Sequence, residues 1–170
     1  SFAYQLQGRD GGDLDLAPLV ASDFDLFIIG YSRDGAEDGA FSRDEIAALK
    51  AGTRVVLAYL SVGEAESYRY YWDERWAPGG QPAEAAPPWL GPTNPAWEGN
   101  YEVRYWDENW QRLIERYLDH IVEAGFDGVY IDFIDAYEFF GPDGELTERE
   151  DAAPLMASFV ERIAEHTRER

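Results

Sequence analysis

Four apolar segments of strand length alternate along this chain with segments of helical periodicity, and this alternation restricts the fold more than any other sequence feature. The expected strands cover residues 3–7, 24–32, 53–60 and the apolar run 129–131. Within the second of them, Phe-Ile-Ile is uninterrupted by polar side chains, as is typical of a parallel strand covered on both faces. Repeated strand–helix units predict parallel strands joined by right-handed crossovers. The chain is therefore expected to be an α/β protein.

Two helices are expected between the first three strands. Residues 14–22, LDLAPLVAS, are predicted to form a short helix that contains Pro18. Residues 42–45, Ser-Arg-Asp-Glu, match a capping box, in which the serine and glutamate side chains bind each other's backbone amides. The helix that begins there is expected to stop at Gly52.

The last two helices are predicted from apolar side chains that recur every three or four residues. The longer one is expected to begin at Trp106 and to end before Gly125, and its stripe consists of Trp106, Trp110, Leu113, Ile114, Tyr117, Leu118, Ile121 and Val122. The final helix is expected after a second capping box, Thr147 to Glu150. Its predicted buried face consists of Leu155, Met156, Phe159, Val160 and Ile163.

Residues 61–105 are predicted to be a long irregular region. They carry most of the prolines of the chain together with the segments GEAESYRYYW and PPWLGPTNPAWEGNY. A loop of this length inside a compact domain is usually functional or disordered, and its density of Tyr and Trp favours a functional loop.

Two folds accept four successive strand–helix units. An open doubly wound sheet would hold them, but the first turn, QGRDGGDLD, lacks the glycine pattern that binds a dinucleotide, and no P-loop occurs. A (β/α)8 barrel, the TIM-barrel type, typically needs about 250 residues, so this chain would supply roughly its first four β/α units. Residues 1–170 are accordingly expected to form a single, partial barrel domain.

The charge of the chain is strongly negative, and this restricts its partners. There are 34 acids and 14 bases, Lys50 is the only lysine, and the formal net charge is −20. Long-range repulsion argues against nucleic acids and anionic membranes as partners and favours neutral or cationic ligands. The same composition suits adaptation to high salt, so a melting temperature that rises between low and molar salt is an expected property.

The chain has no cysteine, so disulfides and thiolate metal sites are excluded and the redox compartment is not indicated. No stretch reaches transmembrane length. The sequence starts at Ser1 without a signal-like apolar run, which agrees with a processed secreted protein as well as with a shortened chain. The oligomeric state is not indicated.

Carboxylates follow the fourth expected strand, in GFDGVYIDFIDAYEFF (residues 125–140). Asp132 stands where a purely structural strand would continue with a hydrophobic residue, and Asp135 follows three residues later. Acids at the carboxyl end of a buried strand are where a β/α protein places its site. The structural alternative is that Asp132 caps the next segment or pairs with an arginine. For Asp135, capping of a turn is as good an interpretation as orienting Asp132 or binding a sugar hydroxyl.

Five motifs together resemble glycoside hydrolase family 114, the endo-alpha-1,4-polygalactosaminidases. They are YQLQ, DLFIIGYSRDG, LAYLSVGEAESYRYYW, PPWLGPTNPAWEGNYEVRYWD and GFDGVYIDFIDAYEFF, and they cover nearly the whole chain. The resemblance implies a (β/α)8 barrel that cleaves alpha-1,4-linked galactosamine or N-acetylgalactosamine polymers with retention of configuration, outside the cell or in the periplasm. It requires no cofactor.

The same resemblance implies that Asp132 is the catalytic nucleophile. Its acid/base partner would be a glutamate at the end of a later strand, beyond Arg170. Because retaining hydrolysis needs both carboxyl groups, these 170 residues are expected to be part of a longer enzyme and to be inactive alone. They are also expected to leave open sheet flanks at residues 24–29 and 129–131.

Further residues are candidates for contact with a sugar, each with plain packing or turn formation as the alternative. Aromatic faces can stack on sugars and attract a protonated amine. The candidates are Tyr4, Tyr31, Tyr59, Glu64, Trp89, Trp97, Tyr101, Asp135 and Tyr137. His120 and His166 are interpreted as solvated. A metal site from Glu64, Asp132, Asp135 and Glu138 would lack any histidine cluster or calcium-loop motif, and none is expected.

Three alternatives remain open on sequence grounds. In the first, Glu64 rather than a later glutamate is the acid partner of Asp132; the structural alternative for Glu64 is an N-cap-like role in a helical segment after the third strand. In the second, the chain is a non-catalytic carbohydrate-binding or pseudoenzyme module. In the third, it is a structural or interaction domain whose acidic residues are incidental.

Overall fold

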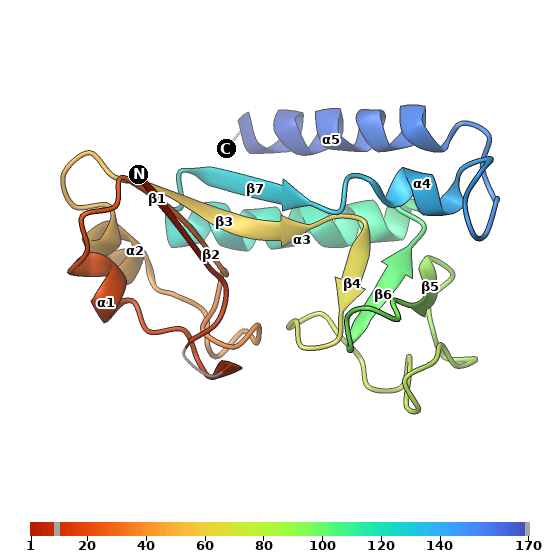
Figure 1. Cartoon of the computed structure of the whole chain (residues 1–170), viewed down its shortest axis with the longest axis horizontal. Coiled ribbons are helices and arrows are strands. Elements are labelled where there is room, and N and C mark those ends of the chain that lie inside the picture. Colours follow the sequence, from red (N-terminus) through yellow and green to blue (C-terminus); the bar gives the residue numbers. More distant parts are fainter. Residues whose placement is uncertain (9–10, 169–170) are drawn as a thin grey trace. The chain divides into compact units, whose positions relative to one another are not determined.

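The computed structural model describes residues 1–8 and 11–168. Its main sheet contains four strands in the order β1-β2-β3-β7 (Figure 1). The strands are β1 (Phe2–Gln5), β2 (Leu26–Ile29), β3 (Val55–Ser61) and β7 (Gly128–Asp132). Both β1 and β3 pair with β2 in parallel, which confirms the predicted α/β fold with a parallel sheet.

The chain divides into two compact units that alternate along the sequence. The first consists of Ser1–Leu60, Tyr68–Tyr70 and Tyr117–Ile131, and the second of Ser61–Ser67, Tyr71–Arg116 and Asp132–Arg170. The first unit holds nearly all of the parallel sheet. Only the last residues of β3 and β7 belong to the second unit.

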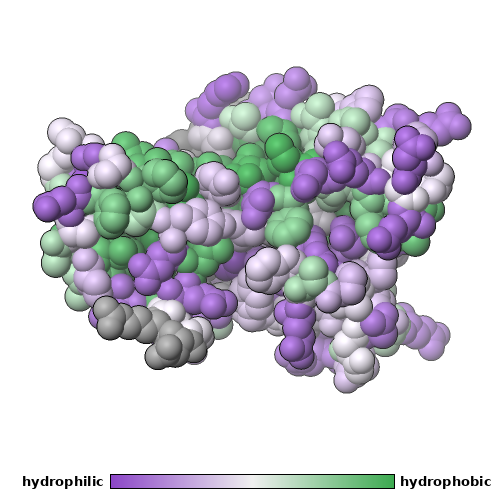
Figure 2. Space-filling view, viewed as in Figure 1, coloured by the Kyte–Doolittle hydropathy of each residue, from purple (hydrophilic) through white to green (hydrophobic). Residues whose placement is uncertain are grey.

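One face of the parallel sheet forms the core of the first unit. Phe27, Ile29, Val56 and Ala58 are fully buried. On the alternate positions, large side chains are exposed, namely Phe2, Tyr4, Val55 and Tyr130. Figure 2 shows hydrophobic side chains gathered over the region in which Figure 1 places β1 and β3.

The open flanks of the sheet are β1 and β7, the first and last strands in its order. The expectation for residues 129–131 is therefore confirmed. The expectation for residues 24–29 is wrong, because β2 pairs on both sides.

The helices α1 (Ala17–Val20) and α2 (Arg43–Leu49) of the first unit form where the local sequence patterns predicted helices. The helix α1 is shorter than expected, with proline at its start. The helix α2 has the predicted capping box: Ser42 Oγ accepts a hydrogen bond from Glu45 N, and Glu45 Oε2 accepts one from Ser42 N at 2.9 Å. This reciprocal pair satisfies two amides that the helix itself leaves free.

The region predicted to be irregular contains a second sheet. The strands β4 (Glu64–Glu66), β6 (Asn100–Val103) and β5 (Leu90–Thr93) form an antiparallel sheet in that order. These strands have three or four residues each, and β5 contains glycine and proline. Such short segments carry too little alternation to be separated from loop by periodicity.

Buried tryptophans form the core around this second sheet. Trp110 is fully buried, its Nε1 donates to the Val62 carbonyl oxygen at 2.9 Å, and its ring centroid lies 4.8 Å from that of Trp89. Trp76 packs edge-on against Trp89 at 5.2 Å. The aromatic residues of this region thus give it a core of its own.

The helix α3 (Glu108–Ala124) confirms the prediction of a long amphipathic helix. Its buried stripe consists of Trp110, Leu113, Ile114, Tyr117, Leu118 and Ile121. It begins two residues later than predicted, since Trp106 precedes it. None of the helices in the described part of the chain is long and apolar enough to cross a membrane.

The last helices are α4 (Ala136–Phe140) and α5 (Ala152–Arg168). The capping box predicted at Thr147 is wrong: Thr147 has a φ of 45°, its Oγ1 donates to the Gly144 carbonyl oxygen at 2.9 Å, and α5 starts five residues later. The predicted buried face of α5 is confirmed for Met156, Phe159 and Ile163.

Candidate active site

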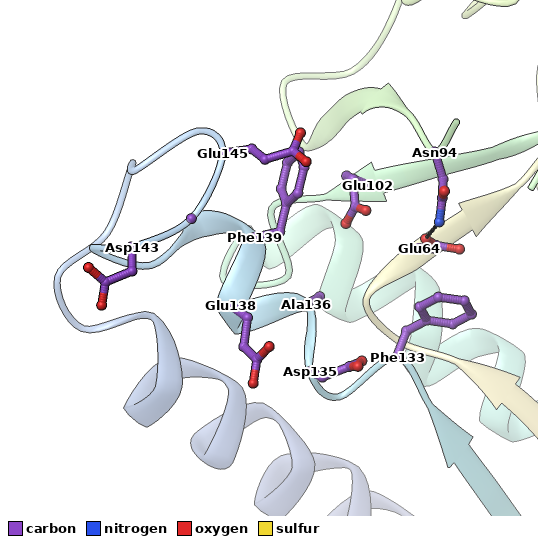
Figure 3. A pocket seen from close by; sticks show the side chains of 11 residues that line it. Glu64, Asn94, Glu102, Phe133, Asp135, Ala136, Glu138, Phe139, Asp143 and Glu145 are labelled. Atoms are coloured by element: carbon purple, nitrogen blue, oxygen red, sulfur yellow. Dashed lines mark hydrogen bonds between the residues drawn. The ribbon is translucent and has the colours of Figure 1, made fainter. Parts of the chain in front are cut away.

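An acidic cavity of about 420 Å³ lies within the second unit (Figure 3). Its walls come from β4, β6, the residues after β7, α4 and the turn that follows α4. Six carboxylates line it, and no lysine, arginine or histidine is among the lining residues. The acids are Glu64, Glu102, Asp135, Glu138, Asp143 and Glu145. A cavity with this lining suits a ligand that carries positive charge or many hydroxyl groups.

Asp132, the predicted nucleophile, is the last residue of β7 and is half-buried. Its main-chain oxygen accepts a hydrogen bond from Val62 N at 3.2 Å, and its Oδ1 accepts one from Phe133 N at 3.0 Å. Phe133 has a φ of 58°, a conformation that non-glycine residues rarely adopt and that often marks functional sites. Phe133 lines the cavity, whereas Asp132 is not among its lining residues.

Gly63 allows the chain after Asp132 to come close to β4. A Cβ at this position would lie 2.1 Å from the Phe133 carbonyl oxygen and 2.5 Å from the Ala136 Cβ. Such a clash with backbone cannot be relieved by a rotamer change. The glycine in the motif SVGEAE is therefore required by the approach of two segments that are distant in sequence.

Glu64 lines the cavity from β4, but its side chain is 0% exposed. Its Oε1 accepts a hydrogen bond from Asn94 Nδ2 at 2.6 Å, and its Oε2 accepts one from Asn100 Nδ2 at 2.7 Å. Burial raises the pKa of Glu64, the two amides oppose this effect, and the nearby charges of Glu66 and Asp132 add to it. The N-cap alternative for Glu64 is wrong, since the residue lies on a strand.

Glu102 is a candidate site residue that the sequence interpretation missed. It lies on β6 directly opposite Glu64, lines the cavity, and its carboxylate has no hydrogen-bond partner among the described residues. Burial, followed by the negative charges of Glu64, Glu145 and Asp135, raises its pKa to about 7. The sequence signal that pointed to Glu102 was the alternation of polar and apolar residues in NYEV (residues 100–103). This alternation is informative only once these residues are assigned to a strand.

Glu102 should make the stability of the protein fall as the pH rises. Its pKa in the folded protein, about 7, exceeds the ordinary value of 4.5, so folding disfavours the ionised form. The penalty is absent below the unfolded value and complete above the folded one, so it develops between about pH 4.5 and pH 7. We expect Glu102→Gln to raise the free energy of unfolding by roughly 1 kcal/mol at about pH 8, allowing for solvent screening, and to leave it unchanged at about pH 4.

Urea unfolding at both pH values measures this effect. Asp143→Asn removes an exposed acid from the same cavity whose charge is not among those that raise the pKa of Glu102, and it should leave the pH dependence as it is. An equal gain from both substitutions, or a gain from Glu102→Gln at the acidic pH, would contradict the assignment.

Asp135 and Tyr137 flank the start of α4. Asp135 is exposed and lines the cavity, and its side chain makes no capping hydrogen bond to the helix. Tyr137 is half-buried, is not among the lining residues, and its hydroxyl donates to Glu138 Oε1 at 3.4 Å. The capping alternative for Asp135 is therefore disfavoured. No group of three or more His, Cys, Asp or Glu among the described residues is arranged to hold a metal ion.

The three aromatic candidates of the second unit have different environments. Trp97 is 63% exposed in the turn between β5 and β6. Trp89 is only 3% exposed and packs on Trp110, and Tyr101 is 4% exposed and stacks on Trp72 at 4.8 Å. The predicted sugar contacts of Trp89 and Tyr101 are corrected accordingly: both rings belong to the core.

The tyrosine candidates of the first unit do not line the acidic cavity. Tyr31 and Tyr59 are buried, and Tyr4 is exposed and packs edge-on against Tyr59 at 6.3 Å. The structural alternative of plain packing fits Tyr31, whose ring lies 5.4 Å from Tyr117. His120 is not solvated as expected, because its Nδ1 is buried and its ring lies 6.0 Å from that of Tyr31.

Solved structures share this fold. Ega3 of Aspergillus fumigatus in complex with galactosamine is 21% identical and superposes with a TM-score of 0.64 over 99% of this chain and 53% of that chain. The glycoside hydrolase domain of PelA from Pseudomonas aeruginosa is 18% identical, with a TM-score of 0.64 over 97% of this chain and 55% of that one. Parallel strands, crossover helices and this similarity define a (β/α)8-barrel glycoside hydrolase fold, of which the chain supplies about half.

The chain belongs to glycoside hydrolase family GH114, whose sequence model matches residues 1–169. An uncharacterized protein of Methanocaldococcus jannaschii is 40% identical over 99% of this chain and 45% of its own length. An uncharacterized protein of Thermotoga maritima is 39% identical over 100% of this chain and 49% of its own length. The chain thus spans about half the length of these relatives.

Proposed function

We propose that this chain carries the nucleophile and part of the substrate-binding surface of a retaining glycosidase that acts on alpha-1,4-linked galactosamine or N-acetylgalactosamine polymers. The observation that carries the choice of substrate is the cavity lined by six carboxylates and no basic residue. Protonated galactosamine units would be attracted to it, and the binding of galactosamine by the structurally similar Ega3 supports this choice. Action outside the cell or in the periplasm is part of this proposal.

Asp132 has the nucleophilic role in this proposal. Its carboxylate attacks the anomeric carbon while the bond to the leaving oxygen breaks, and that oxygen takes a proton from an acid partner. Water then cleaves the glycosyl ester with the partner acting as base, so the configuration is retained. The partner is proposed to be a glutamate outside residues 1–170. Glu64 is less suited to the role, because both of its oxygens already accept hydrogen bonds from asparagine amides.

Calorimetric titration with galactosamine oligomers and matched N-acetylgalactosamine oligomers tests the proposal. We expect tighter binding of the charged oligomer at low salt and a loss of this preference as ionic strength rises. Equal affinity for both oligomers at low salt would contradict the role of the acidic cavity, and the absence of binding to either would contradict the proposed function.

Trp97→Ala should weaken oligomer binding. An exposed indole contributes stacking and, with a protonated amine, cation–π attraction of roughly 1–2 kcal/mol, so the dissociation constant should rise about 5- to 30-fold. Trp97→Phe should retain part of the affinity because it keeps an aromatic face. Unchanged affinity of the alanine variant would remove Trp97 from the binding surface.

A further inference from the structure

We propose that Glu64 is a positioning residue: its buried carboxylate holds the turn 94–100 closed and thereby fixes Trp97 for polymer binding. This role differs from that of a proton donor or a direct sugar ligand. The part of the inference that concerns binding rests on the proposed function. The part that concerns the turn does not.

The carboxylate of Glu64 is buried with amides as its partners. Among the described residues no lysine, arginine or histidine forms an ion pair with it, and its oxygens accept bonds of 2.6 and 2.7 Å from Asn94 and Asn100. A buried carboxylate without hydrogen bonds would be strongly unfavourable, whereas short bonds from neutral donors to a charged acceptor are strong. The three side chains therefore form one clamp.

The two asparagines of the clamp stand at the two ends of a single turn. Asn94 N donates to the Asn100 carbonyl oxygen at 2.8 Å, and Asn94 Oδ1 accepts a hydrogen bond from Ala96 N at 2.8 Å. Glu64 lies on β4, which pairs with the strand β6 that begins at Asn100. One carboxylate thus ties both ends of the turn to the neighbouring strand.

Trp97 occupies the middle of this turn. Its backbone N donates to the Asn94 carbonyl oxygen at 3.3 Å, and its carbonyl oxygen accepts a hydrogen bond from Asn100 N at 3.1 Å. The indole is 63% exposed, and no aromatic ring of the described chain packs on it. The orientation of Trp97 therefore depends on the turn rather than on packing of its own ring.

Loss of one clamp hydrogen bond should loosen the turn without changing the reacting groups. A mobile turn 94–100 loses conformational entropy when Trp97 binds a ligand, so the affinity falls while the chemical step keeps its rate. A proton donor would behave in the opposite way, with a fall in kcat and the loss of one limb of the pH–rate profile.

A hydrogen-bond swap distinguishes these roles. In Glu64→Gln, the side-chain N–H at position 64 faces the side-chain N–H of one asparagine, so one hydrogen bond of the clamp is lost. Adding Asn94→Asp restores this hydrogen bond. The side-chain N–H at position 64 then donates to the carboxylate at position 94, while Asn100 still donates to the side-chain oxygen at position 64. We expect Glu64→Gln to raise the dissociation constant for galactosamine oligomers about tenfold and the double variant to return within about twofold of the wild type.

Two further measurements keep the test independent of folding and of the ligand. Amide hydrogen exchange in residues 94–100 should accelerate in Glu64→Gln and recover in the swap variant, with the melting temperature as a check of the fold. In a Trp97→Ala background, Glu64→Gln should cause no additional loss of affinity, because both changes act through the same side chain. Glu98→Gln, which removes an exposed charge from the same turn, is the matched control and should change affinity less than about twofold.

Each result has a defined meaning. Wild-type affinity and wild-type hydrogen exchange in Glu64→Gln would overturn the inference. It would also be overturned if the double variant Glu64→Gln, Asn94→Asp recovered the exchange rates but not the affinity, because binding would then need the negative charge at residue 64 itself. If the wild type binds no galactosamine oligomer, the proposed function fails and the binding part of the inference fails with it. The exchange rates of residues 94–100 then decide whether Glu64 holds the turn.

Discussion

Replacing Asp132 by asparagine should abolish hydrolysis of galactosamine polymers by the full-length protein while leaving its fold intact. The amide keeps an Oδ1 that accepts the Phe133 N–H bond, and the main-chain bond to Val62 does not involve the side chain. It cannot form the glycosyl ester, so kcat should fall on the order of 10⁴-fold with little change in oligomer affinity. Release of reducing ends, together with calorimetric titration, measures both quantities.

Asp135→Asn is the matched control for this substitution. Asp135 lies three residues further along and lines the cavity, so its loss should affect binding rather than the chemical step, by about tenfold or less. Hydrolysis that survives in Asp132→Asn would disprove the nucleophile assignment. A wild-type protein that binds oligomers firmly but never cleaves them would favour the carbohydrate-binding or pseudoenzyme module.

Trp110→Ala should cause the largest loss of stability expected for a single substitution in the second unit. The residue is fully buried, contacts Trp89 and donates a hydrogen bond to the Val62 carbonyl oxygen. Removing it leaves a cavity and an unpaired carbonyl, so the free energy of unfolding should fall by about 3–5 kcal/mol. Val62 N also bonds the Asp132 carbonyl oxygen, so the end of β7 should be disturbed as well.

Denaturant unfolding of three variants tests the contribution of Trp110. Trp110→Phe keeps an aromatic ring but loses the N–H, and it should lie between the alanine variant and the wild type. Trp97→Ala removes an exposed tryptophan and should change stability by only about 0.5 kcal/mol. Comparable losses for Trp97→Ala and Trp110→Ala would show that burial does not govern the contribution of these side chains.

Local patterns predicted the elements whose signals extend over many residues. The apolar run at Phe27–Ile29, the capping box at Ser42 and the stripe of α3 each identified an element, because strand burial, capping and helical periodicity leave a trace in neighbouring residues. The same reasoning placed Asp132 at the end of a strand. The cap at Thr147 was wrong because the same residue pattern also occurs in turns.

The second sheet could not be predicted in this way. Its strands are short, and β5 and β6 become strands only through pairing with each other and with β4. Trp89 and Tyr101, predicted to face a sugar, are buried by this sheet. Glu102 became a candidate only because its strand places it opposite Glu64.

The sequence by itself determined the α/β class, the family resemblance and the position of Asp132, because these depend on order along the chain and on residue type. Tertiary structure alone decided which carboxylates share one cavity, which tryptophans are exposed, and that both oxygens of Glu64 are occupied by Asn94 and Asn100. Those properties depend on contacts between segments that are some 30 residues or more apart. The free energy that stabilises these contacts comes from the burial of side chains and from hydrogen bonds in the folded chain, which no local sequence pattern records.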